Sequence, residues 1–284
     1  MEGQASAPAA GTVLNALATG TGSAFAIDEY TTATVSLTDA AAVEGTVAGD
    51  PDADTRLVER CVALTTARVG DGEGGTVRTE SEVPMAAGLK SSSAAANATV
   101  LATLDALDAA NNISSAEAAR IGVAAAREVG VTVTGAFDDA SASMLGGVTV
   151  TDNEADEVLA REEVSWDVLV WTPPERAYSA DADVEQCRAI APMADLAADL
   201  ALASEYERAM TVNGLAFCAA LGFDPSPMVE AMPDAAGVSL SGTGPSFVAV
   251  GDRPALARVQ ERWADHEGTT WLTHTQTEGA LIDD

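Results

Sequence analysis

Lysine is almost absent from this sequence: Lys90 is the single lysine in 284 residues, whereas Asp and Glu number 44 and the formal net charge is -30. The acidic residues are spread along the whole chain, which argues against an acidic disordered tail. No basic stripe is present, and dispersed negative charge repels nucleic acid and anionic lipid, so neither is an expected partner. Such a composition is typical of a protein adapted to molar salt, with an ordinary acidic enzyme as the alternative.

Cysteine and long apolar runs are also scarce. The three cysteines, Cys61, Cys187 and Cys218, lie far apart without a Cys-x-x-Cys pair, so we expect buried thiols and neither a disulfide framework nor a zinc site. No apolar stretch is long enough to span a bilayer, and the N-terminus lacks the pattern of a secretion signal. We therefore expect a soluble, cytoplasmic protein without membrane contact. Nothing in the sequence indicates its oligomeric state.

Strand-like and helix-like patterns alternate along the chain and predict an α+β fold. With 47% hydrophobic but only 4% aromatic residues, the core must consist mainly of Ala, Val and Leu, which suits helices packed closely on a sheet. The expected strands cover 31–38, 76–83, 148–151, 164–171, 237–240 and 247–250, and the expected helices cover 91–109, 115–129, 193–221 and 255–266.

Two helix starts carry recognisable capping signals. Ser114 and Glu117 have the spacing of a capping box, and Asp252 with Pro254 begins the last expected helix. In contrast, the acidic segment 152–163 shows no apolar periodicity and is expected to be a turn or a domain junction. We place the domain boundary there, which predicts domains of 1–155 and 156–284.

The most informative segment, 84–96, reads PMAAGLKSSSAAA: a glycine turn is followed at once by a helix that serines can cap. Such a turn aims the unpaired N–H groups of the first helical turn, and the positive end of the helix dipole, at an anion. Gly88 and the serines could serve only as a turn and caps. Lys90 favours phosphate binding, because the single lysine stands beside the helix start, where an exposed ammonium can reach a phosphate. The nucleotide loop of Walker type, Gly-x-x-x-x-Gly-Lys-[Ser/Thr], is absent.

A second segment, 128–147, contains the paired aspartates Asp138 and Asp139 among small and apolar residues. Paired aspartates often lie in a solvated turn. Among apolar neighbours, however, a carboxylate is costly to bury unless a metal or a substrate hydroxyl compensates for its desolvation. Both are therefore candidate catalytic residues.

Two further segments are rich in small residues. GVSLSGTGPS at 237–246 would by default be a hairpin turn, and AGTVLNALATGTGS at 10–23 is a stretch in which a ligand can approach the backbone closely. Taken together with the other segments, they indicate a motif on the substrate side, with Asn15, Thr243 and Gly244 as its candidate residues.

Together these segments resemble the GHMP kinase superfamily, which includes the galactose, homoserine, mevalonate and phosphomevalonate kinases. The phosphate loop of that family reads Pro-x-x-x-Gly-Leu-Gly-Ser-Ser-Ala, and residues 84–94 are similar to it with Lys90 at the third loop position. The forms GLKSSSAAANA, AGTVLNALATG and TGAFDDASAS resemble archaeal shikimate kinases in particular. The resemblance covers most of the first half of the chain and returns at 237–246.

The resemblance implies a ribosomal-protein-like βαβ domain that binds ATP and magnesium, followed by a ferredoxin-like domain. It also implies that ATP phosphorylates the 3-hydroxyl of shikimate in the biosynthesis of chorismate and aromatic amino acids. A homoserine kinase and a non-catalytic metabolite-binding relative stay open as alternatives. The implied ATP-binding residues are Pro84, Ala86, Ala87, Gly88, Leu89, Lys90, Ser91, Ser92, Ser93 and Ala94.

For the remaining site residues, the resemblance implies magnesium ligands at Ser92 and Glu128, with Ser91 and Ser93 as near alternatives to the former. It implies that Asp139 is the catalytic base, and the residues alone do not separate it from its neighbour.

The sequence departs from the family in one respect. Several branches carry an N-terminal lysine that assists the catalytic aspartate, whereas Thr21 stands in the corresponding segment here. Either another cation takes that part, or aspartate and magnesium suffice. The residues that bind the substrate carboxylate are also open: Arg78, Arg127 and Arg176 are candidates, although an exposed arginine is usually part of a surface ion pair.

Overall fold

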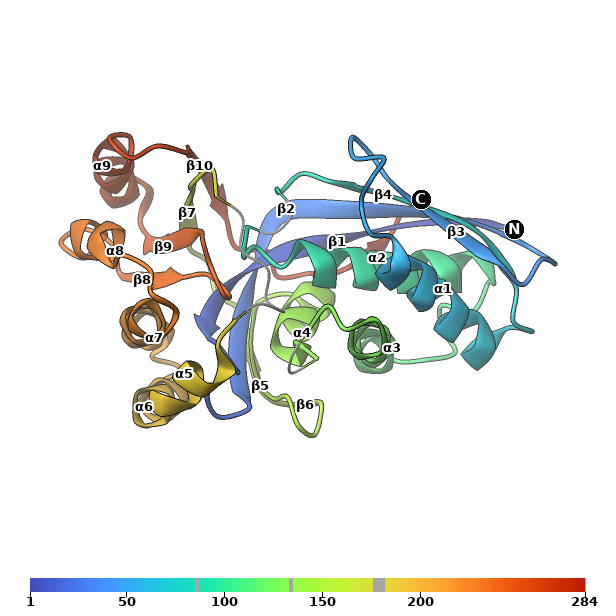
Figure 1. Cartoon of the computed structure of the whole chain (residues 1–284), viewed down its shortest axis with the longest axis horizontal. Coiled ribbons are helices and arrows are strands. Elements are labelled where there is room, and N and C mark those ends of the chain that lie inside the picture. The colour runs from blue at the N-terminus through green and yellow to red at the C-terminus, as the bar shows by residue number, and fades with distance from the viewer. Residues whose placement is uncertain (85–86, 133–134, 176–181, 284) are drawn as a thin grey trace.

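Two long strands, β1 (Glu2–Leu14) and β2 (Thr21–Thr38), form the centre of the larger sheet in the computed structural model (Figure 1). The structure describes residues 1–84, 87–132, 135–175 and 182–283. Residues 31–38 of β2 pair with β4 (Gly74–Ser81), which pairs in parallel with β3 (Val43–Val47). Residues 21–25 of β2 pair with β5 (Val148–Asp152), and β5 pairs with β6 (Glu157–Glu162).

Four helices cover one face of this sheet: α1 (Arg56–Val69), α2 (Ser91–Ala106), α3 (Ser115–Val129) and α4 (Phe137–Leu145) (Figure 1). Helices α1, α2 and α4 pack on the strands, and α3 packs across these helices. The capping box at Ser114 and Glu117 is confirmed: the Ser114 hydroxyl accepts from the Glu117 N–H, and the Glu117 carboxylate accepts from the Ser114 N–H. As expected, α3 ends at Val129.

The smaller sheet is antiparallel throughout, in the order β10 (Thr269–His274), β7 (Asp167–Thr172), β9 (Phe247–Gly251) and β8 (Gly237–Leu240). With it are α5 (Val184–Ala189), α6 (Ala191–Leu202), α7 (Tyr206–Leu221), α8 (Ser226–Ala231) and α9 (Arg253–Trp263). The α9 start is confirmed, since Asp252 accepts a hydrogen bond of 2.8 Å from the Ala255 N–H. The expected helix 193–221 is interrupted instead, because Ser204 has φ of +60° between α6 and α7.

Successive side chains along the strands of the smaller sheet point to its two opposite faces, as the strand period requires. One face packs on its helices, with Leu169 and Phe247 in that core. The other face packs against the larger sheet, where Val168 and Val250 share a core with Ile27 of β2. Mixed sheets and helices, divided into two packed units, confirm the predicted α+β fold.

The sheets divide the chain differently from the predicted boundary at 155. The segment 152–163, expected to be a turn or junction, contains β6, which pairs on one side with β5 and carries charged side chains near both ends, as suits an outer strand. Near the end of the described chain, β11 (Leu281–Ile282) returns to pair with β1. We therefore propose that the first domain extends to Glu162 and also includes β11.

Strand β1 was not among the expected strands because its residues are small. A Cβ at Gly3 would lie 2.3 Å from the Ala102 carbonyl oxygen of α2, and one at Gly11 would lie 2.4 Å from the Phe25 ring. The helix and the aromatic ring thus occupy the space that larger side chains would need. Cys61, Cys187 and Cys218 are buried free thiols, as expected. In the described part of the chain, no helix is long and apolar enough to cross a membrane.

Candidate active site

The start of α2 lies in the middle of the molecule and touches the turn between β8 and β9. Gly88 and Lys90 both have positive φ, of 79° and 63°. A Cβ at Gly88 would lie 2.3 Å from the Ser241 carbonyl oxygen, and the Ser241 hydroxyl donates a 2.8 Å hydrogen bond to the Gly88 carbonyl. The structure therefore brings the segments 84–96 and 237–246 into direct contact.

The serines of this segment do not cap the helix. Lys90 is the N-cap residue, and Ser91, Ser92 and Ser93 occupy the first turn, with no side-chain hydrogen bond capping α2. The expectation of serine caps was wrong. Because these serines do not cap α2, the first N–H groups of the helix have no side-chain cap among the described residues, which suits an anion at this end of the helix.

Lys90 and Asp139 form an ion pair: Nζ lies 2.8 Å from Oδ1, and the side chains are only 8% and 14% exposed. The expectation of an exposed lysine was therefore wrong as well. Burial raises the pKa of Asp139 to about 7, although the Lys90 charge opposes this rise and the Asp138 charge adds to it. The ammonium lies beside Gly242, where a Cβ would lie 3.0 Å from Nζ.

Asp138 is anchored on another side of the α4 start. Its side chain is buried, and its Oδ1 accepts a 2.7 Å hydrogen bond from the Asn153 side-chain amide. Its backbone N–H donates to Oδ1 of Asn153 over 3.1 Å. A Cβ at Gly22 of β2 would lie 2.6 Å from the Asp138 carboxyl group. The two consecutive carboxylates thus have different partners.

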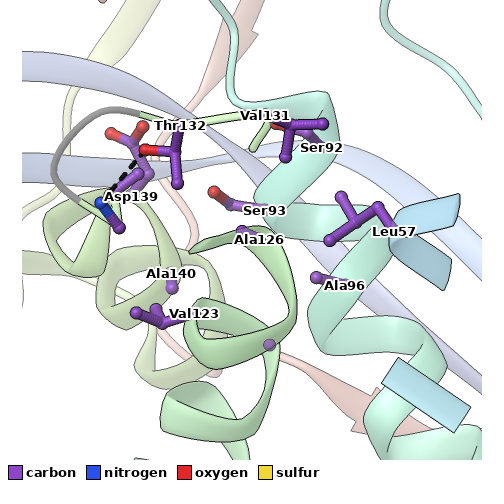
Figure 2. Close-up of a pocket in the computed structure, with 13 residues that line it drawn as sticks. Leu57, Ser92, Ser93, Ala96, Val123, Ala126, Val131, Thr132, Asp139 and Ala140 are labelled. Atoms are coloured by element: carbon purple, nitrogen blue, oxygen red, sulfur yellow. Dashed lines mark hydrogen bonds between the residues drawn. The ribbon is translucent and has the colours of Figure 1, made fainter. Parts of the chain in front are cut away.

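Two pockets meet at Asp139. The first is open to solvent, spans about 420 Å³ and includes Ser92 and Ser93 in its lining; Figure 2 shows Ser93 pointing from α2 toward the side of the pocket where Asp139 and Thr132 lie. The second is also open to solvent and spans about 360 Å³. It is lined by Asn15, Ala16, Leu17, Lys90, Thr132, Ala136, Asp138, Asp139, Gly242 and Thr243. A group in either pocket can therefore reach the same carboxylate.

Asn15 holds the turn after β1 against the turn between β8 and β9. Its amide donates to the Gly242 carbonyl over 2.9 Å, and its side-chain oxygen accepts from the Leu17 N–H. Thr243 lines the second pocket with it. Gly244 has another place: its φ is 83°, and a Cβ there would lie 2.5 Å from the Phe223 ring.

Glu128 lies at the end of α3 and is not among the described residues that line the two pockets. Its carboxylate pairs with Arg60 Nε at 2.5 Å, and both side chains are about half exposed. Across the described ranges, no group of three His, Cys, Asp or Glu residues could hold a metal ion. The structure thus brings Ser92, but not Glu128, to a pocket.

The remaining loop residues have simpler places. Leu89 and Ala94 are buried in the core, and Ala87 is also buried. Pro84 is exposed, and Ala86 lies outside the described residues.

Of the arginines considered for the substrate carboxylate, Arg78 pairs with Glu80 and Arg127 with Asp156, and Arg176 lies outside the described residues. Sequence reasoning missed Thr132, Gly242 and Asn153. Asn153 stands within an acidic run, where a single amide gives no distinct signal.

Comparisons with known proteins identify related sequences and related folds. Residues 56–147 match the model of the GHMP kinases N terminal domain. A shikimate kinase from Halobacterium salinarum is 64% identical over 281 residues, covering 99% of both chains. A shikimate kinase from Methanosarcina mazei is 49% identical over 285 residues, covering 99% of this chain and 97% of that protein.

Solved structures share the fold at low sequence identity. A homoserine kinase from Cytophaga hutchinsonii has a TM-score of 0.74 at 15% identity, covering 99% of this chain and 97% of that one. A mevalonate kinase from Methanococcus jannaschii has a TM-score of 0.74 at 14% identity, covering 96% and 98%. The chain therefore belongs to the GHMP kinase family. Within that family, the similarity to archaeal shikimate kinases predicted from the motifs is confirmed and extends along the whole chain.

Proposed function

We propose that this protein transfers the γ-phosphoryl group of ATP to the 3-hydroxyl of shikimate and releases ADP and 3-phosphoshikimate. The observation that carries the proposal is the position of Asp139, which lines both pockets. A phosphoryl donor in one pocket and a hydroxyl in the other would meet at this carboxylate. The full-length similarity to shikimate kinases supports the choice of acceptor. The reaction belongs to chorismate and aromatic amino-acid biosynthesis, and we place it in the cytoplasm.

The first pocket suits the phosphates of ATP. The uncapped N–H groups at the start of α2 can donate to phosphate oxygens, and the dipole of this 16-residue helix favours negative charge at that end. Ser92 and Ser93 add hydroxyl groups to the lining. Leu89 and Ala94 are buried in the core, which holds the loop in place.

In the transfer step, Asp139 orients the acceptor hydroxyl and takes its proton. The hydroxyl oxygen forms a bond to the γ-phosphorus while the bond from that phosphorus to the β,γ-bridging oxygen breaks, and ADP leaves with the electron pair. A pKa of about 7 suits this role, because a general base works best when its pKa lies near the operating pH.

Lys90 acts on the base in this proposal more than on the phosphates. Its ammonium lies 2.8 Å from Asp139 in a largely buried site, where its charge favours the ionised carboxylate and fixes its direction. We propose that Lys90 takes the part that an N-terminal lysine plays in related kinases, since residue 21 is threonine here. It also lines the acceptor pocket, where it can attract the carboxylate of an acidic substrate.

Magnesium is the proposed metal. Serine hydroxyl and glutamate oxygens are the hard ligands it prefers, and it is usually held by one or two carboxylates together with substrate phosphates, so two protein ligands are enough. We propose Ser92 and Glu128 for this role. Once bound, magnesium would neutralise charge on the phosphates. Glu128 must exchange its ion pair with Arg60 for this purpose, and both side chains are accessible enough to move.

A coupled ADP-release assay in molar potassium chloride tests the function directly. Shikimate, homoserine, mevalonate and galactose would be compared with the wild type and with Asp139→Asn as the control. We expect turnover with shikimate alone and almost none in the variant. Turnover with homoserine instead would favour homoserine kinase, whose fold this chain shares. Binding of shikimate without ADP release would favour a non-catalytic relative.

A further inference from the structure

The turn between β5 and β6 holds both ends of the segment that links α3 to α4. Asn153, at the start of this turn, is 2% exposed. Its side chain makes two hydrogen bonds with Asp138: the amide nitrogen donates to the Asp138 carboxylate, and the amide oxygen accepts from the Asp138 backbone N–H. We call this pair of bonds the Asn153 clasp.

The chemistry of its partners fixes the orientation of the Asn153 amide. A backbone N–H can only donate, and an ionised carboxylate can only accept, so the Asn153 oxygen must face the former and its nitrogen the latter. The Thr151 hydroxyl donates to the same oxygen over 2.8 Å. A rotation of the amide by 180° would break both bonds of the clasp.

The backbone of Asn153 is equally constrained. Its N–H donates to the Gly20 carbonyl over 2.9 Å, and its carbonyl accepts from the Arg127 guanidinium over 3.0 Å. Arg127, near the end of α3, also binds the Asp156 carboxylate through two hydrogen bonds of 2.6 and 2.8 Å. Hydrogen bonds therefore hold the Asn153 backbone on both its N–H and its carbonyl side, so its side chain has a fixed position from which to bind the start of α4.

The side chain of the α4 N-cap residue makes no capping hydrogen bond, so a fixed partner from elsewhere in the described chain matters for this helix. Its N-cap is Ala136, which has φ of 51° and no side-chain oxygen. The N–H of Asp138 is one of the first-turn donors that a cap residue usually satisfies, and Asn153 satisfies it from the turn between β5 and β6. Asp139 is the next residue, about 100° further round the helix.

We propose that Asn153 is a positioning residue for the phosphoryl transfer: the Asn153 clasp fixes the first turn of α4 and so directs Asp139 toward Lys90 and the acceptor hydroxyl. Asp138 is then the anchor of the clasp and not a second base. This inference rests on the proposed role of Asp139.

The first test is Asn153→Asp, which sets a carboxylate against that of Asp138. The two buried charges repel, the first turn of α4 shifts, and a misplacement of about 1 Å is expected to lower kcat ~100-fold. The KM for ATP should change little, because the proposed phosphate loop at the start of α2 is untouched. If Asn153→Asp fails to fold in molar potassium chloride, Asn153→Ala removes both bonds without adding charge and should still lower kcat.

The decisive variant exchanges the two side chains. In Asn153→Asp combined with Asp138→Asn, an amide again faces a carboxylate, and the backbone N–H at residue 138 still finds an oxygen. We expect this double variant to recover most of the lost kcat. If it stays as slow as Asn153→Asp alone, the charge of Asp138 is itself required and the positioning role is wrong.

Thr149→Val is the matched control. Thr149, on β5, makes a buried 2.8 Å hydroxyl contact with Ser141 of α4, whose hydroxyl donates to the Asp138 carbonyl and takes no part in the Asn153 clasp. It should lower the melting temperature but leave kcat nearly unchanged. Equal losses of kcat in Thr149→Val and Asn153→Ala at equal melting temperature would reduce Asn153 to a structural residue. All variants are measured with the acceptor that the wild type uses, so a different substrate would refute the proposed function without affecting this comparison.

Discussion

The Lys90 ammonium and the Asp139 carboxylate come from segments 49 positions apart in the sequence, yet they lie 2.8 Å from each other. Lys90 projects from the start of α2, and Asp139 from the first turn of α4. The single lysine of a strongly acidic chain is thus used inside the molecule, against the carboxylate that we propose as the base.

The pH dependence of turnover should reveal this pair. In the wild type, kcat should rise as the pH passes about 7, where Asp139 loses its proton. Lys90→Met removes the charge that lowers this pKa, so the rising limb should move to higher pH. Lys90→Arg keeps a positive charge and should leave the limb nearer its wild-type position. Identical profiles in all three proteins would contradict the role of Lys90.

The two aspartates should respond very differently to loss of charge. Asp139→Asn should lower kcat by ~100-fold or more, the usual contribution of a positioned general base. Asp138→Asn should be milder, because its side-chain oxygen can still accept from Asn153. Steady-state kinetics of both variants would decide the assignment, which a large loss at Asp138 with near-normal turnover at Asp139 would reverse.

The stability of Asp139→Asn should also depend on pH in a definite direction. The folded-state pKa of Asp139 is raised from 3.8 to about 7, so the native state binds a proton that the unfolded chain has released between these values. The wild type therefore loses stability from this group as the pH rises from about 4 to 7. Relative to the wild type, the variant should gain melting temperature across this range. Parallel curves for the two proteins would mean that the carboxyl has an ordinary pKa.

Glu128 and Arg60 should have opposite effects on the magnesium requirement. Glu128→Gln keeps the shape of the side chain but loses the charge that binds a hard cation, so half-saturation should need ~10-fold or more magnesium. Arg60→Ala removes the competing partner and should lower the requirement. Magnesium titrations at saturating ATP would measure both, and equal shifts in the two variants would argue against Glu128 as a ligand.

Salt should stabilise the fold. A net charge of -30 repels itself in dilute buffer, and the screening length falls from ~10 Å at 0.1 M to ~3 Å at 1 M salt. The melting temperature should therefore rise with potassium chloride. A flat melting temperature up to molar salt would favour an ordinary acidic enzyme.

The sequence predicted local features well where one short pattern controls them. The capping box at Ser114 depends on residues three positions apart, and the strands that flank the turn at 241–246 were placed correctly. The segment 84–96 was identified as containing a helix start, although its serines do not cap the helix. In each case the decisive contacts are between neighbours in the chain.

Features that depend on distant partners were missed or misjudged. The direction of Lys90 is set by Asp139 and by the nearby turn at Gly242, and neither influence is visible in the loop sequence. The Asn153 clasp joins the turn after β5 to the start of α4, and the partners are 15 positions apart in the sequence. Strand β1 was missed because its small residues reflect the close approach of α2 and Phe25 and not a weak strand.

The return of β11 to β1 has a consequence for any attempt to divide this protein. A fragment covering 1–155 would lack both β6 and β11, leaving the edge of β5 that faces β6 and the edge of β1 around Ala5 and Ser6 without partners. Unpaired strands of this kind are templates for other chains, so the fragment should aggregate. The part of the chain that carries the larger sheet is therefore expected to stay soluble only when β11 is present to pair with β1.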